Sequence, residues 1–415
     1  MSLREPGSVH KVAPPVPYVC PVSTQIQALP KAPIVKQAAE PTVYSPDPNF
    51  LERRFAAHLL QHTQAGDPSV KRDTQTIARV THWVIALAAV AGIISGGLIG
   101  GTEIWTREFL ASNVTGVGWR ATAPYWAVFF LFTGLVSAVE IALLYMLALG
   151  GATRIAQHSQ VARSSDVRNE LLAHGLARAA LEFPNPQIRI FGIDPYAYVA
   201  NWKLLAFNLA YKLKVGVSSF VLRVFLRRVA ARMAIRGMVP LMAGPLYALW
   251  NGYILWRIMR EARIRCFGPL VIDKVICTHY RQADSIEASE KTLVFQAIGE
   301  MIREGRDAHP NQICMLAVLT TTLSQDDQPT SDQTIVQDQL AALSKPEQDR
   351  ILDLLTLSCL IGARIHRKQR DFLKSACSAC DVTLDGNRLT RLRKAFVRGH
   401  QVTASNIAAT RMQTA

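Results

Sequence analysis

The stretch ARMAIRGMVPLMAGPLYALWNGYILWRIMREARIR, Ala231 to Arg265, decides how the rest of this 415-residue chain is interpreted. Its centre, residues 238–256, is apolar and nearly long enough to cross a bilayer. A straight helix would lose backbone hydrogen bonds at three helix breakers, Pro240, Gly244 and Pro245. A single crossing would also leave one of the flanking arginine clusters outside the cell. The pattern therefore favours a broken helix that enters the membrane and returns, with a compact helical hairpin packed above the membrane as the alternative.

Two other segments predict membrane-spanning helices. Residues 83–105 carry no charge before Glu103 and have tryptophan at both ends, and residues 124–149 form a second apolar run that opens with Pro124 and aromatic residues. Basic residues precede the first segment and follow the second: Lys71, Arg72, Arg79, Arg154, Arg163 and Arg168. Because lysine and arginine stay on the cytoplasmic side, residues 70–152 are predicted to form a transmembrane hairpin with both ends in the cytoplasm.

Small and acidic residues inside these spans are the first site candidates. Gly92, Gly96 and Gly100 share one helix face and predict close helix packing, although glycine is also simply common in membrane helices. Glu140 is an acid within the second span, where a charge is costly unless it is paired or protonated. It is either a structural carboxyl bonded to Ser137 or Ser95, the favoured interpretation, or part of a proton or ion pathway.

Composition narrows the choice of partner. The chain has 46 Lys and Arg against 31 Asp and Glu, a net charge of +15, and 49% hydrophobic residues concentrated in its middle. This balance favours the anionic headgroups of a membrane leaflet over nucleic acid, because the sequence contains no recognisable nucleic-acid reading element. Seven scattered cysteines indicate a reducing compartment. The predicted location is the inner membrane of a bacterium.

The segments on either side of the hairpin differ in composition. Residues 1–69 are rich in proline and predict a disordered cytoplasmic arm, with one short amphipathic helix at 50–62. Residues 153–270 are basic and predict helices apposed to the membrane. Arginines at helical spacing are predicted to contact anionic lipid, the alternative being the solvated face of a soluble helix: Arg223, Arg227, Arg228, Arg232, Arg236, Arg257 and Arg260.

Residues 271–415 predict a soluble, cytoplasmic helical bundle. Amphipathic segments fall at 288–305, 312–323, 332–343, 370–380 and 388–398. Ser344 and Glu347 form a capping box ahead of a further apolar run. The fold class is therefore all-α, an integral membrane protein with a cytoplasmic bundle.

Two family resemblances follow from these residues. VPLMAGPLYALWNGYILWRIMREARIRCFG, within residues 230–268, resembles the Pro/Gly, Asn and R-x-x-x-x-A stretch of EcsC-like bacterial membrane-associated proteins, which implies a membrane location. The order of helices over residues 288–398 resembles the tellurite-resistance B-type helical fold, whose turns carry acids thought to bind metal. Here the second matching turn, which begins at Gly362, contains no acid, and the first offers Asp326, Asp327 and Asp332, which equally well complement a helix dipole.

No enzyme motif is found, so no catalytic residue, cofactor or metal is predicted. Cys377 and Cys380 form a lone C-x-x-C, which is typical of a buried helix face more than of a redox or zinc site. The favoured function is a membrane-anchored scaffold or stress-response adaptor whose bundle recruits a protein partner or a second copy. The alternative is a subunit of a small oligomeric channel or transporter that uses Glu140, and a metal-dependent enzyme is the third.

Overall fold

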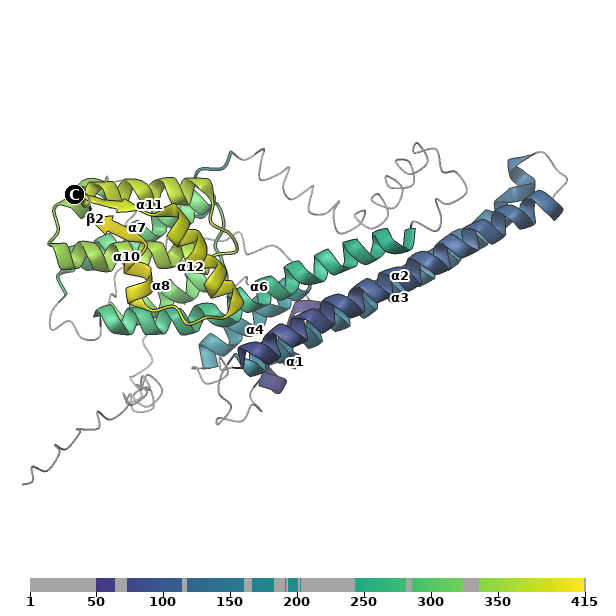
Figure 1. Ribbon diagram of the computed structural model, residues 1–415, viewed down its shortest axis with the longest axis horizontal. Helices are drawn as coiled ribbons and strands as arrows, with labels where there is room; N and C mark the ends of the chain where they lie inside the picture. The colour runs from purple at the N-terminus through teal and green to yellow at the C-terminus, as the bar shows by residue number, and fades with distance from the viewer. Residues whose placement is uncertain are drawn as a thin grey trace, which may run out of the picture. The chain divides into compact units, whose positions relative to one another are not determined.

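The computed structural model describes residues 50–63, 73–113, 118–159, 166–182, 193–200, 243–280, 286–323 and 336–413, together with residues 191 and 202. In these ranges the chain is all-α apart from one short ribbon (Figure 1). The first helices are α1 (Phe50–Thr63), α2 (Thr74–Asn113), α3 (Trp119–His158), α4 (Asp166–Ala180) and α6 (Ala243–Tyr280). The C-terminal helices are α7 (Ala288–Gly305), α8 (Pro310–Leu323), α9 (Val336–Ala341), α10 (Lys345–Ile361), α11 (Arg367–Ala379), α12 (Gly386–Arg398) and α13 (Ala404–Ala408).

Helices α2 and α3 contain the two predicted spans. Each helix has 40 residues, so each is about 60 Å long at 1.5 Å per residue. Both are long and apolar enough to cross a membrane. Only 11% of the most apolar stretch of α3 is buried inside the protein, which leaves most of its side chains facing outward.

Helix α6 contains most of the segment in which a break was predicted. The described part of the 238–256 segment, from Ala243 onward, lies in one continuous helix that runs on to Tyr280, with no return. Gly244 and Pro245 fall in its first turn, where the backbone N–H groups have no helical acceptor and proline therefore costs no hydrogen bond. Pro240 lies outside the described residues. Helix α6 also continues without interruption through the predicted boundary between residues 270 and 271.

The C-terminal bundle is built around α10. Every residue from Ile351 to Ile361 is buried, because α6, α7, α8, α11, α12 and α13 all pack against this helix. The predicted capping box at its start is confirmed, since the Ser344 backbone N–H donates to Glu347 Oε2 at 2.8 Å. Leu352, Leu355 and Cys359 contribute to the core, and all three are fully buried.

The predicted bundle helices are present with small shifts. Helix α7 spans the predicted 288–305, while α11 begins three residues before the predicted start at 370, because His366 and Gln369 form its capping box. The sequence did not predict the ribbon in which β1 (Val382–Leu384) pairs antiparallel with β2 (Arg411–Gln413). Strands of three residues are too short to show an alternating pattern.

Helix α1 is held by a buried ion pair. The Glu52 carboxylate is 1% exposed and accepts from Arg178 Nε of α4 at 2.7 Å, with His174 Nδ1 at 3.3 Å. Burial alone would raise the pKa of Glu52, but the bonds to His174 and Arg178 outweigh it and hold the pKa below its ordinary value. The helix predicted at 50–62 is thus confirmed and docked on α4.

Candidate functional site

A buried polar contact joins α3 to α6. Asn251 Nδ2 donates to Glu140 Oε1 at 2.6 Å, and the two residues are 4% and 6% exposed. The acid predicted as an intramembrane candidate therefore faces α6 and not the outer surface of α3. Both serine hydroxyls named as its partners bond to carbonyls of their own helices: Ser137 to Thr133 and Ser95 to Gly92.

Gly92 brings α2 and α6 into close contact. A Cβ added at this position would lie 2.5 Å from the Tyr247 carbonyl carbon and 2.6 Å from the Ala248 nitrogen, so no larger residue fits without moving α6. At Gly244 the packing on α2 is looser, because an added Cβ would lie 3.4 Å from the Ile93 carbonyl oxygen, an ordinary van der Waals contact. Backbones that approach as closely as at Gly92 gain van der Waals contact along their length.

The three glycines that were predicted to pack against another helix are all buried. Gly92, Gly96 and Gly100 are all buried, whereas Gly97 and Gly101, one residue further along, have no atom within 4 Å of an added Cβ. The α2 face predicted for helix packing is therefore the inward one.

Glu140 lies near the middle of the apolar region. It is 16 residues from the start of the predicted span at Pro124 and 9 from its end at Leu149, or about 24 and 14 Å along the helix. Gly92, where α6 lies against α2, is 9 residues beyond Trp83, at a comparable depth. The Glu140 and Asn251 contact thus occurs where a charge would be most costly if it faced lipid.

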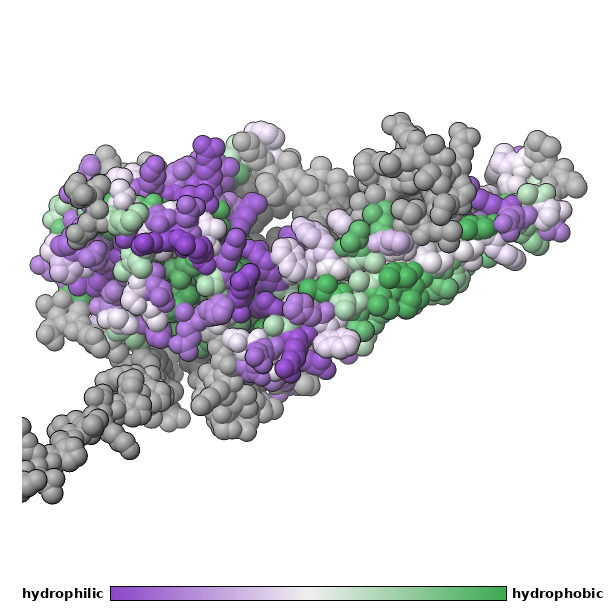
Figure 2. All heavy atoms as spheres, viewed as in Figure 1, coloured by the Kyte–Doolittle hydropathy of each residue, from purple (hydrophilic) through white to green (hydrophobic). Residues whose placement is uncertain are grey.

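The outer surface around this contact is apolar. Large hydrophobic side chains are exposed along all three helices, including Leu131 (76%), Met146 (71%) and Leu249 (73%). Trp83, Trp105 and Trp119 are exposed near the ends of the apolar stretches. Hydrophobic residues gather over α2 and the first half of α6, as Figure 2 shows in green. An apolar surface of this extent is unusual in contact with water and normally marks contact with a membrane or another protein.

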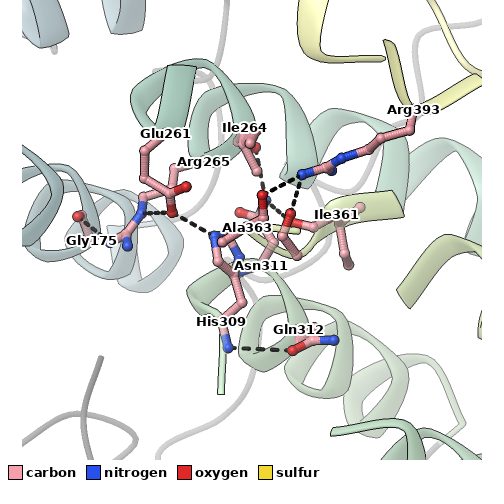
Figure 3. A network of polar contacts seen from close by, with 11 residues as sticks. Gly175, Glu261, Ile264, Arg265, His309, Asn311, Gln312, Ile361, Ala363 and Arg393 are labelled. Carbon is pink, nitrogen blue, oxygen red and sulfur yellow. Dashed lines mark hydrogen bonds and ion pairs between the residues drawn. The ribbon is translucent and has the colours of Figure 1, made fainter. Parts of the chain in front are cut away.

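A second polar cluster ties the other half of α6 to α4 and α8 (Figure 3). Glu261 Oε1 accepts from Arg265 Nε at 2.9 Å and from His309 Nε2 at 2.8 Å. Arg265 Nη1 also donates to the Gly175 carbonyl oxygen in α4. One carboxylate on α6 thereby binds Arg265, one turn further along α6, and His309, the residue just before α8.

The hydrogen bonds of the His309 ring determine which of its two nitrogens carries the proton. Its Nδ1 accepts from the Asn311 backbone N–H at 3.2 Å, so the proton is on Nε2, which donates to Glu261. Burial would raise the pKa of Glu261, but Arg265 and His309 outweigh it and hold the pKa well below its ordinary value. Glu261 is therefore a carboxylate acceptor at neutral pH.

Asn311 and Arg393 bind carbonyl oxygens at the centre of the bundle. Asn311 Nδ2 donates to Ile264 O at 2.8 Å and to Ile361 O at 3.0 Å, and only a glycine at 268 leaves room for its side chain. Arg393 Nη2 donates to the carbonyls of Gly362 and Ala363, the latter at 3.0 Å. This turn, which begins at Gly362, is the second of the two turns compared with the tellurite-resistance B-type fold. Its carbonyl oxygens therefore bind the Arg393 guanidinium.

The remaining predicted site residues divide into two groups. Arg257 is 57% exposed and pairs with Glu182 Oε1 at 3.7 Å, and Arg260 is partly buried. The other predicted lipid-contacting arginines lie outside the described residues: Arg223, Arg227, Arg228, Arg232 and Arg236. The weak metal candidates Asp326, Asp327 and Asp332 also lie outside them. In the part of the chain that the structure describes, no three His, Cys, Asp or Glu residues gather as a metal site requires.

Both cysteines of the C-x-x-C are free and buried in the core. Burial raises the pKa of the Cys377 thiol to about 11 and also raises the pKa of Cys380. The neutral thiol is thus the form at neutral pH, which is a poor nucleophile and a poor metal ligand.

Asn251 is the site residue that the sequence did not single out for this role. The available signal was an uncharged polar residue inside an apolar run, together with the need of Glu140 for a partner. Comparison with known protein families, characterised proteins and solved structures found no match. The resemblances to EcsC-like proteins and to the tellurite-resistance B-type fold stay predictions.

Proposed function

We propose that this chain is a membrane-anchored adaptor, in which α2 and α3 insert as a hairpin and α6 carries a helical bundle at the cytoplasmic face. The observation that supports this most directly is the apolar outer surface of α2, α3 and the first half of α6, with tryptophans near its ends. In the proposed orientation the two ends of the hairpin and both termini of the chain lie in the cytoplasm of a bacterium.

Helix α6 gives the adaptor its rigidity. It is one helix of 38 residues, about 57 Å long, whose first half packs on α2 and α3 and whose second half packs inside the bundle. Polar contacts hold it at two positions, through Asn251 in its first half and through Glu261 at its middle. A bundle attached in this way is held at a set position from the membrane and can present a surface to a protein partner or to a second copy.

The placement of Glu140 favours the adaptor over a channel or transporter subunit. The carboxyl faces Asn251 of the same chain, where it joins two helices, whereas a conducting acid must be reached by water or ions. In reconstituted vesicles we expect Glu140→Gln to leave ion and proton flux unchanged. A loss of flux in this variant would favour the transport function.

Anchoring and recruitment are tested in two steps. The full chain should resist alkaline extraction from membranes, and a variant with residues 83–149 replaced by a flexible linker should be released. A proximity-labelling enzyme fused after Ala415 should then mark a set of membrane-associated proteins that is lost without the hairpin. Release of the unaltered chain, or an identical labelled set in both proteins, would contradict the proposal.

The basic stretch between the hairpin and α6 is tested separately. Alanine at Arg223, Arg227, Arg232 and Arg236 should weaken association with anionic vesicles in a chain that lacks residues 83–149. Unchanged association and unchanged partner labelling would contradict the predicted role of these arginines.

A further inference from the structure

The exposed side of α12 carries basic side chains that neither pack in the core nor form an ion pair with a described residue. This helix has five basic residues and no acid in 13 positions. Arg393 is buried and binds carbonyls, and Arg388 pairs with Asp385 at 3.2 Å. The other three, Arg391, Lys394 and Arg398, are exposed and form no ion pair with any residue that the structure describes. We call them the α12 basic face.

Helical spacing puts these three charges on one side. At 100° per residue, positions 391, 394 and 398 fall within about 60° of one another. Leu389, Arg393 and Phe396, which are buried, lie on the opposite side. The core packing of α12 therefore aims the α12 basic face away from the bundle.

The end of α12 touches the start of the first apolar helix. Gly399, with φ of 93°, ends α12, and a Cβ added there would lie 3.2 Å from the Phe267 ring of α6 and 3.3 Å from Thr74 Cγ2. Thr74 is the first residue of α2. The last turn of α12, with Arg398, thus ends close to the start of α2, from which the chain enters the apolar stretch.

The distance along α2 puts Thr74 a few ångströms beyond the headgroup zone. Thr74 precedes Trp83 by nine residues, or about 14 Å of helix. Tryptophan favours the membrane interface, and headgroups extend about 5–8 Å beyond the hydrocarbon on each side. A long arginine or lysine side chain at this level spans much of the remaining distance and can reach phosphate groups.

We infer that the α12 basic face binds the anionic headgroups of the leaflet in which the hairpin is anchored, and so sets the orientation of the bundle on the membrane. This inference rests on the proposed membrane anchoring and adds a lipid site that lies outside residues 223–260. Its ligand chemistry is a phosphodiester headgroup with net negative charge, such as phosphatidylglycerol. Guanidinium and ammonium groups both donate hydrogen bonds to phosphate oxygens. Binding by three such groups together should increase steeply with the negative charge of the lipid.

The experiment uses the full chain in nanodiscs of phosphatidylcholine alone or mixed with phosphatidylglycerol. A donor fluorophore is attached at Asn387→Cys, an exposed position on α12, and the acceptor is a headgroup-labelled lipid. Cys20 and Cys277 are replaced by serine, because the other five cysteines are buried. Energy transfer should rise when phosphatidylglycerol is present and fall again with salt.

Charge reversal provides the decisive comparison. The triple variant R391E/K394E/R398E should shift the ratio of docked to undocked bundle toward the undocked state by about tenfold or more, abolishing the lipid-dependent rise in transfer. The matched control R367E/R370E/K374E reverses three exposed charges on α11, which contacts neither α2 nor α6 closely. It should keep the rise.

Each other outcome overturns the inference. Energy transfer that does not change with phosphatidylglycerol would show that α12 does not bind anionic headgroups. The same conclusion would follow if both triple variants lost the lipid-dependent rise equally. Tighter binding of the α12 basic face to heparin than to anionic nanodiscs would point to a soluble polyanion as its ligand. Failure of the chain to insert into nanodiscs would refute the anchoring itself, whereas insertion without lipid-dependent transfer refutes only the headgroup site.

Discussion

The two halves of α6 lie in opposite surroundings. In the first half, Leu249 and Tyr253 are 73% and 52% exposed beside outward-facing apolar residues of α2 and α3. In the second half, Phe267, Ile272 and Ile276 are at most 1% exposed, inside a bundle whose outer residues are polar. The bundle gains its stability from removing apolar side chains from water, as ordinary soluble domains do. The apolar region must depend on close backbone packing and on internal polar contacts.

The largest effect is expected where a charge is fully buried in the bundle. Arg350 binds Glu290 with two hydrogen bonds of 2.8 and 2.6 Å, and Glu290 is 0% exposed. Arg350→Ala leaves that carboxylate without its bidentate partner and should lower the free energy of unfolding by about 3–5 kcal/mol. Chemical denaturation followed by circular dichroism measures the loss.

Arg367→Ala is the control for Arg350. Arg367 is 95% exposed and 3.9 Å from Asp371, so removing it should change the unfolding free energy by less than about 0.5 kcal/mol. Similar losses in the two variants would show that burial does not set the strength of these ion pairs.

In the apolar region the expected effect is steric. Gly92→Ala places a methyl group 2.5 Å from the backbone of α6, and we expect this overpacking to cost about 1–3 kcal/mol. Gly97→Ala and Gly101→Ala meet nothing within 4 Å and should raise stability slightly, because alanine favours helix more than glycine does. Thermal unfolding in micelles compares the three. A neutral Gly92→Ala would mean that α6 does not pack against α2 at this position.

The polar contact within this region should be worth less. Asn251→Leu removes the donor to Glu140, and the buried carboxyl loses about 1–2 kcal/mol of stabilisation. The double variant Glu140→Leu with Asn251→Leu should lose less than the sum of the single changes, because the pair is removed together. Strictly additive losses would contradict a direct contact between the two side chains.

Glu261 should make the bundle sensitive to acid. Its pKa in the folded chain lies below the ordinary value of 4.5, so the folded state binds the proton more weakly than the unfolded state. The stabilisation is therefore complete above about pH 4.5 and is lost as pH falls below it, with a slope of at most about 1.4 kcal/mol per pH unit from this group. Glu261→Gln should flatten the decline of stability below pH 4.5. An unchanged slope would assign the acid sensitivity to other carboxylates.

Hydropathy and capping signals were enough to predict much of the helical structure. The runs at 83–105 and 124–149 and the capping box at Ser344 depend on neighbouring residues only, and the helices lie where these signals put them. The partner of Glu140 could not be predicted in this way, because Asn251 is 111 residues away and their contact depends on the register of two helices. The position of Pro245 in the first turn of α6 likewise depends on where tertiary packing starts that helix.

In the proposed topology, α2 and α3 cross the membrane as a hairpin, with the bundle at the end opposite the turn between them. Sided labelling with an impermeant maleimide tests this most directly, using Arg120→Cys near the turn and Asn387→Cys in the bundle of the chain that lacks Cys20 and Cys277. We expect Arg120→Cys to be labelled from outside intact cells and Asn387→Cys only after the inner membrane is opened. Labelling of both positions from the same side, or recovery of the chain in the soluble fraction, would contradict it.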